Sequence, residues 1–268
     1  MSLRHSFLAL ACAVPLLWGS PALAKGTRAP AKEVISFGTL QAPSPEMAQG
    51  QARTWLQGVG KADATTLKKF DALWKETDRP LLDKVADSLA LGDPRAAKLL
   101  SEARDPEAPA PTKVPDLLKD AKRPAFYRAN LALAYAKALS NRRVYEEALD
   151  ALKAAKPDQV VDPAGYFFHK AVAEHALLLP QEASRSIVGV LEDVAEAPER
   201  YKLVAMLMLY DMQSWQTKDL GEIARKMDNI ERRLELARGG PKTQKVQKEV
   251  VARLDEIIKK LEKQQGGS

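Results

Sequence analysis

Residues 163–191 read PAGYFFHKAVAEHALLLPQEASRSIVGVL, and this stretch decides the fold. Apolar side chains recur in it at spacings of three and four residues, which is the pattern of helices that bury one face. Pro163 and Pro180 each suit the first turn of a helix. The stretch therefore predicts two successive helices, at about 163–179 and 181–196.

The same helical spacing continues along most of the chain. Further helices are expected at 46–57 and 63–76, from Pro80 and from Pro94, and at 124–140, 143–156, 199–214, 218–238 and 242–264. Only residues 33–37 resemble a short strand, because strand-forming residues alternate with polar ones nowhere else. The sequence predicts an all-α fold.

A Pro-rich stretch at 105–115 divides this helical pattern. It cannot continue a helix, and it is expected to act as a stiff linker. A small helical module at 46–104 precedes it, and longer helices at 116–217 follow. A helical hairpin at 218–264 and a disordered tail at 265–268 complete the expected organisation.

Two pairs of residues reveal an internal period in the longer helices. Glu147-Ala148 is followed 35 residues later by Glu182-Ala183, and apolar residues come after each pair. Around the second pair, five residues occupy positions 4, 8, 20, 24 and 27 of a two-helix unit: Phe167, Ala171, Ala183, Ile187 and Val190. Small residues at positions 8 and 20 let paired helices approach closely, so the period predicts stacked helix pairs.

At these positions the chain resembles the tetratricopeptide repeat. The resemblance covers roughly 123–215 and implies a concave helical face that binds extended peptides. The first unit departs from the motif, because the connection between Tyr135 and Tyr145 is longer than the motif allows. The third unit, from Pro198, has a longer second helix than the family.

The last two helices are expected to pair as a coiled-coil-like hairpin, which turns at Gly239-Gly240-Pro241. Apolar residues recur at steps of three and four in both helices: Leu220, Ile223, Met227, Ile230, Leu234 and Ala237, then Val250, Leu254, Ile257 and Leu261. Antiparallel pairing matches 230 with 250, 227 with 254, 223 with 257 and 220 with 261, at number sums of 480 or 481.

Two sets of residues flank this predicted seam. Arg225, Lys226, Arg232 and Arg233 are interpreted as part of a solvated charged face. A neighbouring apolar face is expected to dock on the preceding helices or on a partner; it consists of Val246, Val251 and Ile258.

The first residues have the order of a secretory signal peptide. A short polar start with Arg4 precedes an apolar run at 7–18, and the small-residue triplet Ala22-Leu23-Ala24 predicts cleavage after Ala24. The run is too short for a membrane span, and acylation of Cys12 is the alternative. The mature chain is then expected in the periplasm or the medium, with a disordered leader at 25–45.

The charge distribution narrows the class of partner. The net charge is +6, but basic and acidic residues are interleaved, which argues against nucleic acid. From Lys218 onward there are thirteen Lys or Arg and nine Asp or Glu. This excess makes binding to anionic lipid or cell-wall polymer through the hairpin an alternative function.

No residue set in the chain has the spacing of a catalytic, cofactor or metal site. His169 and His175 lie six residues apart, so one helix places them on different faces, and a metal or acid–base role with Glu174 is disfavoured. Gly58-Val-Gly-Lys61 lacks the residues of a phosphate loop. Large apolar residues at helical spacing are interpreted as core anchors and fillers: Trp55, Trp74, Trp215, Phe167, Phe168, Met206, Met208 and Met212.

The sequence favours a non-catalytic, exported scaffold that binds a protein or peptide through its helical-repeat surface, without a cofactor. The anionic-surface protein is the first alternative. An uncharacterised hydrolase that uses His175 and neighbouring carboxylates is the second.

Overall fold

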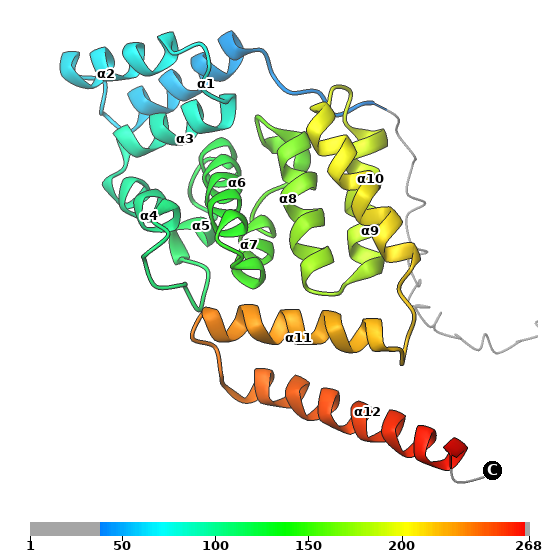
Figure 1. Cartoon of the computed structure of the whole chain (residues 1–268). Helices are drawn as coiled ribbons and strands as arrows, with labels where there is room; N and C mark the ends of the chain where they lie inside the picture. The colour runs from blue at the N-terminus through cyan, green and yellow to red at the C-terminus, as the bar shows by residue number, and fades with distance from the viewer. Residues whose placement is uncertain (1–37, 266–268) are drawn as a thin grey trace, which may run out of the picture. The chain divides into compact units, whose positions relative to one another are not determined.

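The computed structural model describes residues 38–265, in which all regular secondary structure is helical and no strand is longer than a single bridge. The predicted signal peptide, Cys12, the strand candidate at 33–37 and the last three residues lie outside this range. The helices, labelled in Figure 1, are α1 (Pro45–Gly58), α2 (Ala64–Lys75), α3 (Leu81–Gly92), α4 (Pro94–Arg104), α5 (Asp116–Lys119), α6 (Ala125–Asn141), α7 (Tyr145–Leu152), α8 (Pro163–Ala176), α9 (Pro180–Val188), α10 (Glu199–Gln213), α11 (Leu220–Glu235) and α12 (Pro241–Gln265). None of them is long and apolar enough to cross a membrane.

The all-α prediction is confirmed, and the helix boundaries lie close to those expected. Two short elements were not predicted, α5 and a 3-10 turn at Pro157–Gln159, and the helix expected at 181–196 ends in a π turn at Gly189–Asp193. Each has five residues or fewer, so none is long enough to show a helical period in the sequence.

One core joins the helices on both sides of the Pro-rich stretch. It extends from Ala48 to Tyr166, and in it the ring of Trp55 in α1 stacks on that of Tyr127 in α6, with centroids 5.1 Å apart. Residues 105–115 are not helical, as expected, but Val114 is buried and Arg238 donates a hydrogen bond of 2.6 Å to the carbonyl of Pro111. The stretch therefore packs against the core and is not a free spacer.

The α6–α7 and α8–α9 hairpins have the same turn, 35 residues apart. In each, the second of three connecting residues has a left-handed backbone: Arg143 with φ 61° and Leu178 with φ 60°. The amide of the next residue, Val144 or Leu179, donates to the carbonyl five residues earlier, at 2.9 Å in both turns. This is the Schellman closure of a helix C-terminus.

The equivalence of the turns corrects the interpretation of the first unit. Helix α6 continues to Asn141, so the connection to α7 is as short as that between α8 and α9. The positions that correspond to Ala171 and Ala183 are Ala136 and Ala148, and all four side chains are fully buried. Both helix pairs are thus closely packed around small residues.

Gly189 makes a testable contribution to the second pair. A Cβ atom at this position would lie 2.4 Å from the ring of Phe167. We expect Gly189→Ala to lower the free energy of unfolding by about 1–3 kcal/mol, because the ring must leave its packed position. Gly50→Ala is the control: nothing lies within 4 Å of its added Cβ, so loss of glycine entropy should stabilise α1 by up to about 1 kcal/mol. Urea unfolding measures both, and equal effects would contradict the role of Gly189.

The predicted disordered leader at 25–45 is wrong for its described part. Leu40 forms an isolated bridge with Val194, in which its amide donates to Asp193 at 3.0 Å and its carbonyl accepts from Ala195 at 3.0 Å. The Leu40 side chain packs on the second core, between α8, α9 and α10. The π turn leaves this backbone free to pair, which the sequence did not indicate.

Helices α11 and α12 pack through a small apolar cluster of Ile223, Ile230, Val246, Val250, Leu254 and Ile257. Four other residues of the predicted seam are about half exposed or more: Leu220, Met227, Leu234 and Leu261. Of the neighbouring face, Val246 is covered, whereas Val251 and Ile258 remain exposed. The distal part of this face does not dock on the preceding helices, so only the expected alternative, a partner, remains for Val251 and Ile258.

Candidate interaction surfaces

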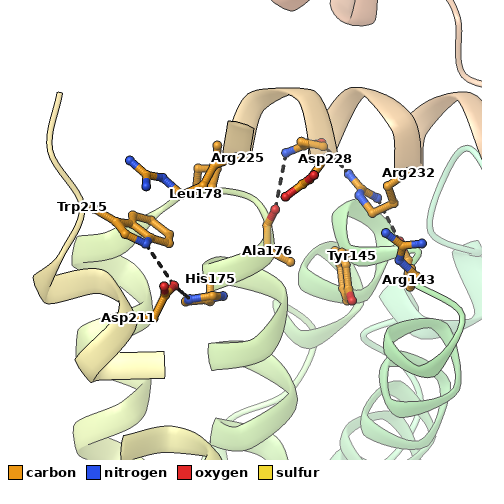
Figure 2. Close-up of a pocket in the computed structure, with 11 residues that line it drawn as sticks. Arg143, Tyr145, His175, Ala176, Leu178, Asp211, Trp215, Arg225, Asp228 and Arg232 are labelled. Atoms are coloured by element: carbon orange, nitrogen blue, oxygen red, sulfur yellow. Dashed lines mark hydrogen bonds and ion pairs between the residues drawn. The ribbon is translucent and has the colours of Figure 1, made fainter. Parts of the chain in front are cut away.

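A polar cavity of about 330 Å³ lies where α11 crosses the ends of the two hairpins. Figure 2 shows the residues that line it, and both left-handed turn residues, Arg143 and Leu178, are among them. Helix α11 contributes Arg225, Asp228, Asn229 and Arg232. The lining of the cavity thus comes in part from the two equivalent turns and in part from α11 of the C-terminal hairpin.

A histidine–aspartate pair lies at one end of this cavity. His175 Nε2 is 2.8 Å from Asp211 Oδ2, and the indole N–H of Trp215 donates to the same oxygen at 3.0 Å. The guanidinium of Arg225 lies over the Trp215 ring, 4.9 Å from its centroid. Such a pair orients an imidazole, and no Ser, Thr or Cys is among the residues that line the cavity.

The other histidine lies in the core. His169 is 6 % exposed, and its Nε2 atom has no hydrogen-bond partner within the described residues. Burial, together with the charge of Lys137, lowers the pKa of His169 to about 4, so its imidazole is neutral at neutral pH. Glu174 is also buried and accepts hydrogen bonds of 2.6 Å from Lys170 and Ser186. The structure therefore separates His169, His175 and Glu174 rather than joining them in one site.

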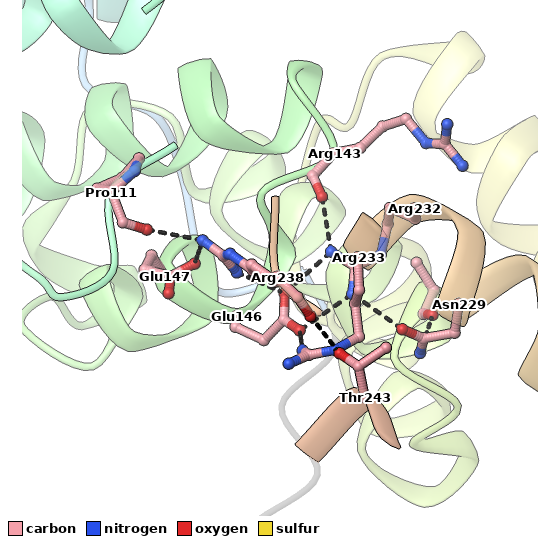
Figure 3. A network of polar contacts seen from close by, with 10 residues as sticks. Pro111, Arg143, Glu146, Glu147, Asn229, Arg232, Arg233, Arg238 and Thr243 are labelled. Carbon is pink, nitrogen blue, oxygen red and sulfur yellow. Dashed lines mark hydrogen bonds and ion pairs between the residues drawn. The ribbon is translucent and has the colours of Figure 1, made fainter. Parts of the chain in front are cut away.

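A buried cluster of charges fastens α11 to the start of α7 (Figure 3). Arg232 binds Glu146 through two hydrogen bonds of 2.9 and 3.0 Å, and Arg233 binds the same carboxylate. Arg238 binds Glu147 at 2.8 Å. The side chain of Arg232 is only 3 % exposed, so the interpretation of Arg232 and Arg233 as a solvated face is wrong.

The pKa of Glu146 reflects these partners. Burial by itself would raise it, but the hydrogen bonds and charge of Arg232, together with the charge of Arg233, lower it to about 2. Glu146 is therefore ionised at neutral pH and forms ion pairs with Arg232 and Arg233. Its role in the structure is to hold the hairpin on the helix pairs.

No protein-family model, curated protein or solved structure matches the chain.

Large apolar side chains are exposed on α10. This helix packs on α8 and α9 through Ala205 and Met208. Its other side exposes five large apolar residues, at 38–76 % of their area: Leu203, Val204, Met206, Leu207 and Tyr210. Met206 was interpreted as a core filler, and this interpretation is wrong.

The exposed side of α10 is unusual for a protein surface. A helix that is apolar on all sides is normally buried on all sides, and contiguous exposed apolar patches mark interaction sites. Leu203, Leu207 and Tyr210 follow at spacings of four and three, so they form one continuous ridge. The next helix along the chain does not cover this ridge, because α11 instead crosses the ends of α7 and α8, where it contacts Glu146 and Ala176 (Figure 1).

Of the predicted aromatic anchors, Trp55 is buried and Trp74 packs against the core, where its indole donates to Ser88 at 3.0 Å. Phe167 and Phe168 pack against the second core. Trp215 is the exception, because it lines the polar cavity. The His175–Asp211 pair was not found by sequence reasoning, since its members lie 36 residues apart on different helices.

Proposed function

We propose that this chain is an exported, non-catalytic scaffold that binds a protein partner through the exposed apolar side of α10. The observation that carries the proposal is the ridge of Leu203, Leu207 and Tyr210 on a helix whose residues from 203 to 210 are all apolar. A large uncovered apolar surface of this kind favours association with another protein.

The fold proposed with this function is a stack of tetratricopeptide-like helix pairs. Its support is the pair of equivalent turns 35 residues apart and the buried small residues in both pairs. In such a stack each pair buries the face of its neighbour, and the terminal helix needs a polar outer face to remain soluble. Helix α10 lacks that polar face, so a helix of the partner takes the position of the next helix in the stack.

The two alternative functions find less support in the contacts. Arg232, Arg233 and Arg238 are bound to Glu146 and Glu147, outside the hairpin, and Glu235 is bound to Arg143. These pairs leave ten basic and eight acidic residues from Lys218 onward, so the excess available to an anionic surface falls from four to two. For the hydrolase, the cavity beside the His175–Asp211 pair is lined by no Ser, Thr or Cys that could form a covalent intermediate.

Co-purification tests the proposal. The full chain, with its predicted signal peptide, is expressed in the bacterium from which it comes, and bound partners are cross-linked to it before purification. We expect Leu207→Glu combined with Tyr210→Glu to reduce recovery of the cross-linked partner at least tenfold, because central apolar contacts each contribute about 2 kcal/mol or more to binding. Both side chains are exposed, so the helical circular dichroism and the melting temperature should not change. The mass of the purified chain also tests cleavage after Ala24.

The matched control is Met47→Glu combined with Val59→Glu, which places the same two charges on exposed apolar residues of α1 and its C-cap. The control should recover the partner as the wild type does. Equal recovery by the α10 variant, or equal loss in the control, would exclude α10 as the binding surface.

A further inference from the structure

The α11–α12 hairpin has a second apolar surface, separate from α10. Six large apolar residues of α11 and α12 lie outside the buried cluster and are 48–65 % exposed: Leu220, Met227, Leu234, Val251, Ile258 and Leu261. Figure 1 shows α12 on the far side of α11 from α7, α8 and α9. These exposed residues therefore have no cover from the helix pairs.

The spacing of these residues is that of a further coiled-coil stripe. Leu220, Met227 and Leu234 follow at steps of seven on α11, and Val251 and Ile258 follow at a step of seven on α12. Each helix thus carries one stripe that packs within the hairpin and an adjacent stripe that is uncovered.

Three residues of the uncovered stripes, Met227, Leu234 and Val251, line a groove of about 660 Å³. Its apolar lining is Met227, Ile230, Leu234, Val250 and Val251. Its charged lining consists of acids alone, and all of them are on α11: Asp228, Glu231 and Glu235. Glu235 is paired with Arg143, whereas Asp228 and Glu231 are exposed and form no ion pair with other residues between 38 and 265.

We propose that this groove binds one amphipathic helix with basic flanks from a partner protein. Apolar side chains of that helix, at spacings of three and four, lie between the stripes and complete a three-helix bundle. Lys or Arg residues beside its apolar face lie next to Asp228 and Glu231. The proposal does not depend on binding at α10, because the two surfaces share no residue.

The charges favour this occupant over a second copy of the chain. A second hairpin would bring either the same acids, Asp228 and Glu231, or the mixed charges of α12, such as Lys248 and Asp255. Like charges repel across an interface, and mixed charges match the acidic rim only in part. A helix with uniformly basic flanks fits both the apolar stripes and the rim.

Two labelled synthetic peptides of about three heptads provide the probes, with Leu at positions a and d and either Lys or Glu at the flanking positions e and g. Fluorescence anisotropy with the full chain measures their affinity. We expect the Lys-flanked peptide to bind at least tenfold more tightly than the Glu-flanked one, and less tightly as salt is added. Met227→Glu combined with Val251→Glu should remove this binding, whereas Leu207→Glu combined with Tyr210→Glu on α10 should leave it unchanged.

A charge reversal makes the test specific for the acidic rim. Asp228→Lys combined with Glu231→Lys should invert the preference, so that the Glu-flanked peptide binds more tightly. Both positions are exposed, and circular dichroism checks that each variant remains folded. An unchanged preference in this variant would overturn the proposal, as would loss of peptide binding only in the α10 variant. Sedimentation as a dimer that Met227→Glu and Val251→Glu convert to monomers would assign the groove to a second copy instead.

Discussion

Glu146→Gln is expected to lower the free energy of unfolding by about 3–5 kcal/mol, because it leaves buried guanidinium groups without their carboxylate. Arg232 donates to both carboxylate oxygens of Glu146 and Arg233 donates to one of them. In the Gln variant one of these oxygens becomes an NH2 group that cannot accept, and the negative charge is lost. The change keeps the shape of the side chain, so the lost stability reports on charge. Urea unfolding measures the change, and hydrogen exchange shows whether α11 opens first.

Glu235→Gln is the matched control for this variant. It removes the ion pair with Arg143, in which both side chains are 52 % exposed, so the expected change is within about 1 kcal/mol. Equal losses in the two variants would mean that the Glu146 cluster does not hold the hairpin.

The dependence on pH identifies the carboxylate. The folded pKa of Glu146 is about 2, below its ordinary value of 4.5. A lowered carboxylate pKa stabilises the fold above the unfolded value, and this stabilisation is lost as the pH falls from about 4.5 towards 2. The wild type and Glu146→Gln should therefore converge in stability across this window. The folded pKa of His169 is about 4, below its ordinary value of 6.5. As the pH falls from 6.5 towards 4, this lowered pKa reduces the stability of the wild type and of Glu146→Gln by the same amount.

Ile230→Asp is expected to have an effect of similar size, at least about 3 kcal/mol, on the α11–α12 hairpin. Ile230 is 9 % exposed and packs in the cluster with Val250. The substitution removes that apolar contact and places an unpaired carboxylate in the same position. Hydrogen exchange should show α12 unprotected, and the melting curve should shift or acquire an earlier phase.

Met227→Asp controls for the charge itself. Met227 lies one turn away on α11 but is 52 % exposed, so its carboxylate remains hydrated and the expected change is below about 1 kcal/mol. An unchanged melting curve for Ile230→Asp would contradict the pairing of the two helices at this residue.

The sequence was sufficient to predict the helices, because their period and their proline and glycine boundaries are local features. It did not predict what covers each helix. An arginine such as Arg232 has the same local pattern whether water or a carboxylate 86 residues away is its partner. Met206 has the pattern of a core residue, and its exposure arises only because α11 crosses the helix ends.

The candidate surfaces were predicted less well for the same reason. The hairpin stripes were visible at steps of three and four, but the sequence did not divide them into a buried set with Ile230 and an exposed set with Met227. Asp211 was not linked to His175, since their approach depends on how α10 packs on α8. Distances along the chain say nothing about these contacts.

The two repeated turns impose a constraint on how this protein can vary. A left-handed backbone costs a residue other than glycine about 1–2 kcal/mol, and glycine would close both turns more readily. Yet residues 143 and 178 carry long side chains, and those side chains wall the polar cavity. Glycine at either position would remove the strain of the left-handed backbone, but it would also remove a side chain that lines the cavity. At these two positions, a change that stabilises the fold therefore alters the shape of the cavity.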